Sequence, residues 1–485
     1  MLMAGDALLP VRSSFWLIVG IVVVCAAIIS WSERTRARTV SVNLFMLALA
    51  IRVTALLVFT GAALREGGPF LGPDSTGYFN GATEIVARGF DLGTNPLVFF
   101  GTYDISHYYL FAVAIRFLHA DLFGLQTLNI GLTALAAPLS FAIARNVLPR
   151  VARAVGLFVA FYPSLIVLSA VDLLKDPSVV FATLLSVWAI LRIVRARTLR
   201  PVLFYSLPAA IALMYLRTGR LYSFAYLEAA TAAAGMWVII FPRRLCFRTR
   251  AAAAGLLFVF SAAEIVPARV GWPISPTLFV SQVQYALGTP TMRIYSAGLV
   301  DRLEQRNRTE ARYGQMLATA PGQTLEVPHG HTLEVPHGHT LPSFAANLLR
   351  RVLGPFPWIP PQHWTFREIQ SGDYLLYPGI LIWYGILPFL LVGLLIESRR
   401  LFRRDDVRFA TAFLWIFTVL YFAQYLVLNV SYRQREVIVP VLFLFACLGV
   451  LHVVARRRFA LWYGAYWTAL GLLAAAHISV RAWLK

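Results

Sequence analysis

Charged residues are scarce in this chain of 485 residues: they make up 14% of it, against about 25% in ordinary soluble domains. Acidic residues are the scarcest, with 23 Asp and Glu against 43 Lys and Arg, which leaves a net charge of +20. Hydrophobic residues reach 59%, and the mean hydropathy is +0.67. This composition excludes a soluble globular enzyme and predicts a membrane protein, because apolar runs long enough to cross a bilayer recur along the chain.

Cysteine and lysine are also rare. The three cysteines have no CxxC spacing, which excludes a disulfide framework and a zinc ribbon. Lysine occurs only at Lys175 and at the terminal Lys485, so nearly all positive charge is carried by arginine. Guanidinium groups bind phosphate in a bidentate manner, which makes their positions informative.

About half of the basic residues lie in short clusters between apolar runs, the pattern that the positive-inside rule predicts for cytoplasmic loops. This distribution argues against a nucleic-acid partner, despite the high net charge. The clusters are at 34–38, 145–153, 192–200, 243–250, 399–408 and 456–458.

The apolar runs predict an all-α polytopic membrane protein with about twelve transmembrane helices. Placing every arginine cluster inside puts the long insertions on the other, outer side. The run from Asp104 to Ala120 is interpreted as an amphipathic helix on the outer surface, since a span there would reverse the following loop. The predicted spans are 15–31, 40–63, 124–145, 154–173, 178–195, 201–216, 222–241, 251–267, 376–396, 408–430, 437–455 and 459–480.

We predict four regions along the chain. Residues 1–39 form an additional N-terminal helix and basic loop, and residues 40–267 form a transmembrane core whose first outer loop is 64–123. Residues 268–375 form an extracytoplasmic loop domain, and residues 376–485 hold the C-terminal helices. The loop domain contains the sequence TLEVPHGH twice in succession, and a slipped duplication explains this repeat better than a histidine metal site does.

Asp74 is the first candidate functional residue. It follows Gly72 and Pro73 at a predicted helix start in the first outer loop, with Tyr78 one turn on and Glu84 ten residues on. Its placement fits both a catalytic carboxylate and a simple helix N-cap, and these alternatives stay open on local features.

Asp172, Lys175 and Asp176 form a second cluster, between two apolar spans. Charges at the mouth of a hydrophobic bundle are costly unless they are paired or solvated, and they tend to mark a site. The alternative is a plain helix start, with Pro177 in the first turn and Asp176 as its cap.

Arginines on the predicted outer face form a third group, contrary to the positive-inside trend. Binding of a phosphorylated ligand would explain them, and interfacial snorkelling is the alternative. His107, at the start of the surface helix, is a further candidate for lining a cleft. The outer arginines are Arg217, Arg220, Arg433 and Arg435.

The order of these motifs resembles the C-fold (GT-C) glycosyltransferases, such as the protein O-mannosyltransferases and the lipid A aminoarabinose transferase. The resemblance covers roughly residues 40 to 267. The motifs that carry it are Asp74-Ser75-x-x-Tyr78-x-x-x-Ala82, Ala87-Arg88-Gly89, Leu122-Phe123-Gly124, Tyr162-Pro163 and Lys175-Asp176-Pro177.

The resemblance implies a sugar donor carried on a polyprenyl phosphate. It also implies that Asp74 is a general base or acceptor positioner, and that Asp176 is a second outer aspartate. Many members have an acidic pair in the first loop, whereas Ser75 follows Asp74 here, which weakens a metal site built on Asp74. Arg433 and Arg435 resemble arginines that several members place near the lipid phosphate.

The chemistry of such a transfer suits these residues. A carboxylate can remove the proton of the acceptor hydroxyl as it attacks the anomeric carbon, and in-line displacement then inverts that centre. The departing phosphate needs positive charge, which arginine or Lys175 would provide; a divalent cation such as Mg²⁺, Mn²⁺ or Ca²⁺ would serve equally. The weak candidates for holding such an ion are Asp74 and Asp176.

The sequence therefore predicts an inverting membrane glycosyltransferase of the bacterial inner membrane, with its active site on the extracytoplasmic side. Its partners would be a polyprenyl-phosphate sugar, a glycan, lipid or protein acceptor, and membrane lipids. Two alternatives stay open: a polysaccharide polymerase of the O-antigen type, and a flippase or transporter for lipid-linked sugars.

Overall fold

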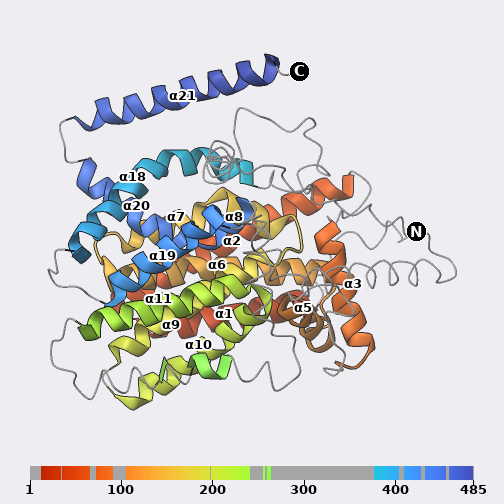
Figure 1. Ribbon diagram of the computed structural model, residues 1–485. Coiled ribbons are helices and arrows are strands. Elements are labelled where there is room, and N and C mark those ends of the chain that lie inside the picture. Colours follow the sequence, from red (N-terminus) through yellow and green to blue (C-terminus); the bar gives the residue numbers. More distant parts are fainter. Residues whose placement is uncertain are drawn as a thin grey trace, which may run out of the picture.

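The structure is a computed structural model, and it consists of helices throughout the part of the chain that it describes (Figure 1). The predicted loop domain 268–375, with its repeat, lies outside this part, as does most of the predicted span 251–267. The described residues are 13–33, 35–65, 73–90, 105–196, 198–240, 255–256, 259–263, 376–402, 409–427, 432–454 and 458–483.

Long apolar helices confirm the predicted polytopic membrane fold. Within the described residues, seven helices are long and apolar enough to cross a membrane, namely α1, α2, α6, α9, α10, α18 and α21, and a bent pair makes an eighth. The elements are α1 Ser13–Trp31, α2 Thr35–Arg65, α3 Pro73–Ala87, α5 Ile105–Leu118, α6 Leu122–Val147, α7 Ala152–Phe161, α8 Pro163–Ala170, α9 Asp176–Arg195, α10 Leu199–Gly219, α11 Leu221–Ile240, α18 Tyr377–Phe402, α19 Phe409–Val427, η2 Tyr432–Val437, α20 Val439–Val453 and α21 Phe459–Trp483.

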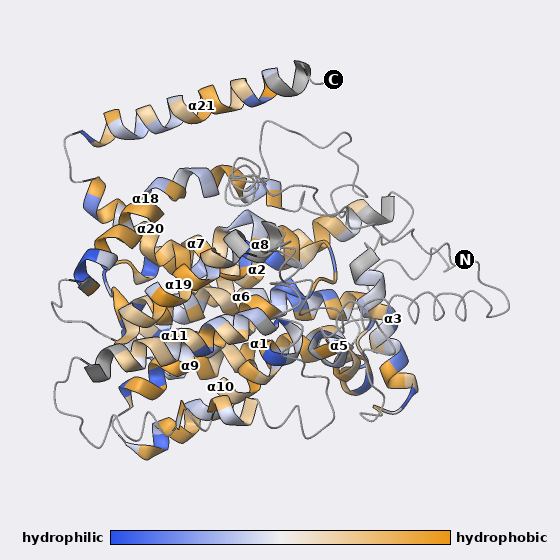
Figure 2. Cartoon of the chain, in the orientation of Figure 1, coloured by the Kyte–Doolittle hydropathy of each residue, from blue (hydrophilic) through white to orange (hydrophobic). Residues whose placement is uncertain are grey.

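Helix α6 is the central helix of the bundle, and the whole apolar window within it is buried. Helices α1, α2, α7 and α9 pack around it, and α10 packs on the far side of α9. Apolar residues dominate this region, as Figure 2 shows. By contrast, α21 lies apart from the bundle in Figure 1 and meets α18 through Tyr463 and Tyr466, whose hydroxyls donate to the carbonyls of Gly385 and Tyr384.

The predicted span 154–173 is not one straight helix but two, α7 and α8, which meet at 43°. Pro163 causes the break because it has no N–H to donate to the carbonyl of Val159. The guanidinium group of Arg52 instead donates to the carbonyls of Val159 and Ala160, at 3.1 and 3.0 Å. It also bonds Thr133 at 3.1 Å. This mid-helix charge therefore satisfies broken backbone groups, which is why it lies buried in α2.

Helices α18 and α20 cross very closely, and two glycines make the crossing possible. A Cβ added to Gly393 would lie 1.9 Å from the carbonyl oxygen of Phe445, and one added to Gly449 would lie 1.9 Å from that of Phe389. Such small-residue contacts let the backbones of membrane helices approach. The crossing fixes the position of α20, and with it the short helix η2 that precedes it.

Buried Glu33 ties three helix ends together at one end of the bundle. It follows α1, and its two carboxylate oxygens accept from Arg145 at the end of α6 and from Arg192 near the end of α9. Arg195 donates to the side chain of Asn146 at 2.6 Å. We call this the basic end.

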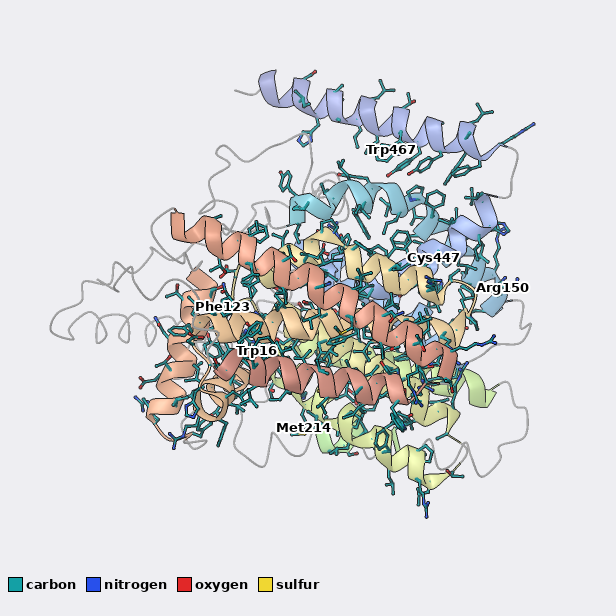
Figure 3. The ribbon with its side chains drawn as sticks, turned by 180° about the vertical axis from the view of Figure 1, so that it is seen from behind. Trp16, Phe123, Arg150, Met214, Cys447 and Trp467 are labelled. Carbon is teal, nitrogen blue, oxygen red and sulfur yellow. The ribbon has the colours of Figure 1, made fainter. Side chains whose placement is uncertain are left out.

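The opposite end of the bundle carries α3, α5 and the start of α9. In Figure 3, Phe123 near the start of α6 and Arg150 just beyond its end lie at opposite sides of the molecule. Helix α9 runs between the two ends over 20 residues, a rise of about 30 Å, which matches the hydrocarbon core of a bilayer. The basic residues of α9 and the charges at its start are thus separated by one membrane thickness.

Candidate functional site at the end opposite the basic loops

An ion pair between Asp176 and Arg220 lies at the centre of this end. Asp176 is the first residue of α9, and Arg220 directly follows the last residue of α10, so each charge complements the dipole of its own helix. The guanidinium group of Arg220 donates to the carboxylate of Asp176, and both side chains are buried. This pair joins two sequence-distant helix ends and anchors the site.

His107, Ser178 and Tyr215 form a hydrogen-bonded group beside that ion pair. The Ser178 hydroxyl lies 3.1 Å from His107 Nδ1 and donates to the carbonyl of Lys175 at 2.8 Å. The Tyr215 hydroxyl lies 3.3 Å from the same imidazole nitrogen. Burial lowers the pKa of His107 to about 3, although Asp176 acts to raise it, so the imidazole is neutral at physiological pH. It therefore acts as a hydrogen-bonding group rather than as a cation.

Helix α3 brings the first predicted loop to the same place. Tyr78 contacts the His107 ring edge-on, with 4.7 Å between the ring centres. The hydroxyl of Ser75 accepts from the backbone N–H of Leu173 at 3.1 Å, and so does the Asp172 carboxylate at 2.9 Å. Asp74 belongs to the first turn of α3, and its side chain lies outside the described part of the structure.

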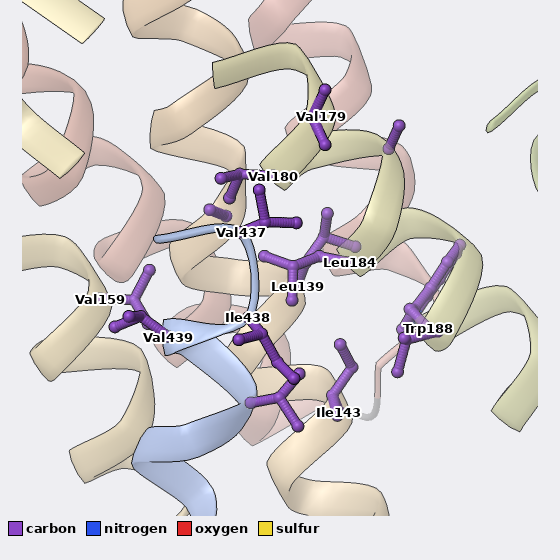
Figure 4. Close-up of a cluster of buried hydrophobic side chains, with 14 of the residues drawn as sticks. Leu139, Ile143, Val159, Val179, Val180, Leu184, Trp188, Val437, Ile438 and Val439 are labelled. Carbon is purple, nitrogen blue, oxygen red and sulfur yellow. The ribbon is translucent and has the colours of Figure 1, made fainter. Parts of the chain in front are cut away.

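Helix η2 contributes a second pair of charges, Arg435 and Glu436, both of which are fully buried. Arg435 Nη2 lies 3.6 Å from Glu436 Oε1, and the guanidinium group lies 4.3 Å from the ring centre of Trp383. Figure 4 shows how this segment is held: its last residue and the two that follow enter a cluster of apolar side chains from α6, α7 and α9. The cluster includes Val437, Ile438, Val439, Leu139, Ile143, Val159, Val179, Val180, Leu184 and Trp188.

The Glu436 carboxylate is unusual because neither of its oxygens has a hydrogen-bond partner within the described residues. Burial raises its pKa to about 7, although Arg435 acts to lower it. Tyr162, at the break between α7 and α8, also lies next to this carboxylate, and the charge of Asp176 contributes to the upward shift. The two pairs of charges thus belong to one polar cluster, which consists of Asp172, Lys175, Asp176, Arg217, Arg220, Arg435, Glu436, His107 and Tyr78.

Three predicted residues of this polar cluster lie at its edges. Arg217 is buried, with its guanidinium carbon 5.7 Å from the ring centre of Phe224. Lys175 is half-buried at the residue before α9. Asp172 is buried at the corner between α8 and α9.

For two other predicted site residues, the structure shows no contact with the polar cluster among the side chains that it describes. Glu84 forms an ion pair with Arg88 one helical turn away at 2.6 Å, and 45% of each side chain is exposed. Arg433 belongs to η2, but its side chain lies outside the described part.

Sequence reasoning missed four contributors to the site: Ser178, Tyr215, Trp383 and Glu436. Ser178 and Tyr215 lie inside predicted spans, where a hydroxyl looks like any polar residue tolerated within a membrane helix. Glu436 directly follows the predicted Arg435, and an acidic residue beside that arginine could have been recognised as a site residue from the sequence. Nothing in the sequence indicated Trp383, because its contact with Arg435 depends on how α18 and α20 cross.

A divalent cation finds no ready site among the residues described. No three His, Cys, Asp or Glu side chains come together there in a way that could hold a metal. The carboxylate of Asp176, one of the two weak candidates, accepts from Arg220. The described donor set does not fit a metal.

Comparison with known proteins supports the fold. No protein-family model matches the chain, and no curated protein matches it in sequence. The solved structure of the archaeal oligosaccharyltransferase AglB from Archaeoglobus fulgidus, in complex with an inhibitory peptide and a dolichol-phosphate, is similar with a TM-score of 0.52. The match has 15% identity and covers 89% of this chain and 54% of AglB. The chain thus spans about half of that protein, and the likeness supports the predicted all-α polytopic membrane fold.

Proposed function

We propose that this protein is a membrane glycosyltransferase that transfers a sugar from a polyprenyl-phosphate-linked donor to an acceptor, with inversion at the anomeric carbon. The observation that carries the proposal is the polar cluster: segments from α3, α5, α9, α10 and η2 meet at the end opposite the basic loops. Sugar transfer from a lipid phosphate would belong to EC class 2.4.

The charges of the polar cluster suit a phosphate. Four cationic side chains, Lys175, Arg217, Arg220 and Arg435, occur there with three carboxylates, from Asp172, Asp176 and Glu436. Arginine side chains in such a buried environment suit an anionic ligand, because guanidinium groups bind phosphate in a bidentate manner. A departing lipid phosphate is already negative, so guanidinium groups would stabilise its developing charge without supplying a proton.

Asp74 is the residue that we assign as general base. Its neighbour Ser75 is hydrogen-bonded to Leu173, so the backbone of Asp74 lies beside the corner that leads into α9. A carboxylate there would accept the proton of the acceptor hydroxyl as the C–O bond to the anomeric carbon forms and the bond to phosphate breaks. Tyr78 and His107, which contact each other, would line the same site.

The cellular setting follows from the charge distribution. We place the arginine loops in the cytoplasm and the site on the extracytoplasmic face of a bacterial inner membrane. The AglB structure holds a dolichol-phosphate and a peptide, which supports a lipid-linked donor here. A glycan, a lipid and a protein are all open as acceptors.

Incubation of purified protein in nanodiscs with radiolabelled polyprenyl-phosphate monosaccharides tests the proposal. Wild type should consume one donor, and Asp74→Asn should reduce the rate by about 10²- to 10⁴-fold, the usual contribution of a general base. The control is Glu84→Gln, which removes an exposed acid of the same helix and should leave the rate unchanged. Full activity of Asp74→Asn would contradict the assignment of the base.

A polymerase of lipid-linked repeat units is the nearest rival. Such an enzyme would ignore monosaccharide phosphates and bind a diphosphate-linked oligosaccharide. Binding of that oligosaccharide without consumption of any monosaccharide donor would therefore favour the polymerase over our proposal.

A further inference from the structure

The two ion pairs of the polar cluster differ in the distance between their charged groups. Arg220 is hydrogen-bonded to Asp176, whereas Arg435 stays 3.6 Å from Glu436, beyond hydrogen-bond distance. Both oxygens of Glu436 lack a hydrogen-bond partner in the part of the chain that the structure describes. A buried carboxylate in this state is costly, because it has lost water without gaining full pairing.

Stacking on Trp383 holds the Arg435 guanidinium in place independently of Glu436. The 4.3 Å separation from the ring centre is well within the range of a cation–π contact. Arg435 can therefore change its anionic partner without losing its orientation. Arg220 has no such freedom, because its bond to Asp176 also joins α10 to α9.

We propose that Glu436 is a resident counter-anion of Arg435, which the phosphate group of the lipid-linked donor displaces when it binds. This inference rests on the proposed function, since it takes a lipid phosphate as the ligand. The displaced carboxylate loses its cation and gains a negative neighbour, so it takes up one proton from solvent and stays buried as the neutral acid. Donor binding is thereby coupled to protonation of Glu436.

The surroundings of Glu436 favour this exchange. Arg435 on η2 is the cation whose charge affects it, Tyr162 approaches from the break between α7 and α8, and Asp176 acts from α9. The adjoining first turn of α20 has no titratable residue. Burial and Asp176 raise the pKa of Glu436 to about 7, which places the exchange within the physiological range.

The pH dependence of binding follows from these charges. Above pH 7 the free protein holds Glu436 ionised, and the competent, protonated form falls to about one-tenth at pH 8, which weakens apparent affinity about tenfold. At pH 6 nearly all of the protein is already protonated at Glu436. Glu436→Gln mimics the neutral acid, so its binding should lack the pH dependence that Glu436 contributes.

Binding of undecaprenyl phosphate to protein in nanodiscs, at pH 6 and pH 8, tests the inference. The probe's own phosphate also titrates near pH 6, so the informative quantity is the ratio of wild-type to Glu436→Gln affinity at each pH. The variant should bind about tenfold tighter than wild type at pH 8 and about equally at pH 6. Glu397→Gln is a matched control: it changes a buried acid, paired with Arg400 at 2.7 Å on α18, outside the cluster.

Calorimetry of lipid-phosphate binding to wild type gives a second test that does not depend on the variant being folded. Binding at pH 8 in buffers of different ionisation enthalpy should show uptake of about one proton, and binding at pH 6 should show no net uptake. At pH 8 the free phosphate is already a dianion, so it cannot account for this pattern.

A ratio of affinities that does not change with pH, or no proton uptake at pH 8, would overturn the inference and leave the proposed function standing. Loss of binding in Glu436→Gln would also overturn it, because Glu436 would then help to hold the ligand. Failure of wild type to bind the lipid phosphate at pH 6 would contradict the proposed function itself.

Discussion

Arginine and carboxylate side chains meet at both ends of the helix bundle, but they meet differently. At the basic end, Glu33 uses both carboxylate oxygens, each bonded to a different arginine. Those arginines, Arg145 and Arg192, keep 28% and 19% of their side chains exposed. At the opposite end, Arg435 and Glu436 are wholly buried, and neither carboxylate oxygen of Glu436 has a hydrogen-bond partner within the described residues.

This difference separates a structural ion-pair cluster from the binding site that we propose. A carboxylate whose bonds are complete gains nothing from a ligand, and Glu33 holds the ends of α1, α6 and α9 together. Buried charge with incomplete bonding is tolerated where a ligand completes it. Mutations at the two ends should therefore affect different properties, stability at the basic end and activity at the other.

The largest effect is expected at the Asp176–Arg220 pair, which joins two helix ends and for which we also propose a part in phosphate binding. Asp176→Asn leaves a buried guanidinium group without its counter-charge, which should cost about 3–5 kcal/mol of stability. The double variant Asp176→Asn with Arg220→Met should recover much of this loss, since no buried charge is left. Thermal unfolding in detergent measures the stability, and donor consumption measures the activity.

Activity separates the two roles of that pair. If Arg220 contributes to phosphate binding, the double variant should be stable and inactive. A stable and fully active double variant would show that the pair is structural, as the Glu33 cluster is.

A smaller effect is expected for Glu33→Gln at the basic end. The two arginines that pair with Glu33 keep contact with water. The free energy of unfolding should therefore fall by about 2 kcal/mol, between the values for exposed and fully buried ion pairs. Donor consumption per folded molecule should not change. A drop in activity at unchanged stability would contradict the purely structural role of the basic end.

The effect that is smallest at neutral pH is a pH dependence through His107. Burial holds its pKa near 3, below the ordinary value of 6.5, so the unfolded chain binds a proton that the folded protein does not. His107 thus lowers stability progressively as the pH falls from 6.5 towards 3. His107→Gln cannot titrate, so the difference in Tm between wild type and variant should shift in favour of the variant on acidification from pH 7 to pH 4. A difference that stays constant would show that the imidazole is not buried in neutral form.

The sequence was sufficient for the polytopic helical fold and for much of the polar cluster. Asp172, Asp176, Arg217, Arg220 and Arg435 stood out because charge is rare at the ends of apolar spans, and the structure brings them to one end of the bundle.

The errors of detail have physical causes. The span 154–173 was predicted as one helix although it contains Pro163, and Arg52 satisfies the carbonyls that the resulting break exposes. Glu84 was a candidate because acidic residues are rare on the predicted outer side. Arg88, four residues later, is a typical ion-pair partner within a helix. Partners such as Trp383 depend on helix crossings, which hydropathy does not encode.

One measurement tests the central claim most directly: the affinity of undecaprenyl phosphate for wild type, Arg435→Gln and Arg145→Gln in nanodiscs at pH 6. Removal of the Arg435 charge is tolerable because Glu436 can remain protonated, and it should weaken binding at least tenfold, a cost of about 1.4 kcal/mol. Arg145→Gln, at the basic end, should bind like wild type. Equal affinities for all three proteins, or a larger loss in Arg145→Gln, would contradict the assignment of the polar cluster as the phosphate site.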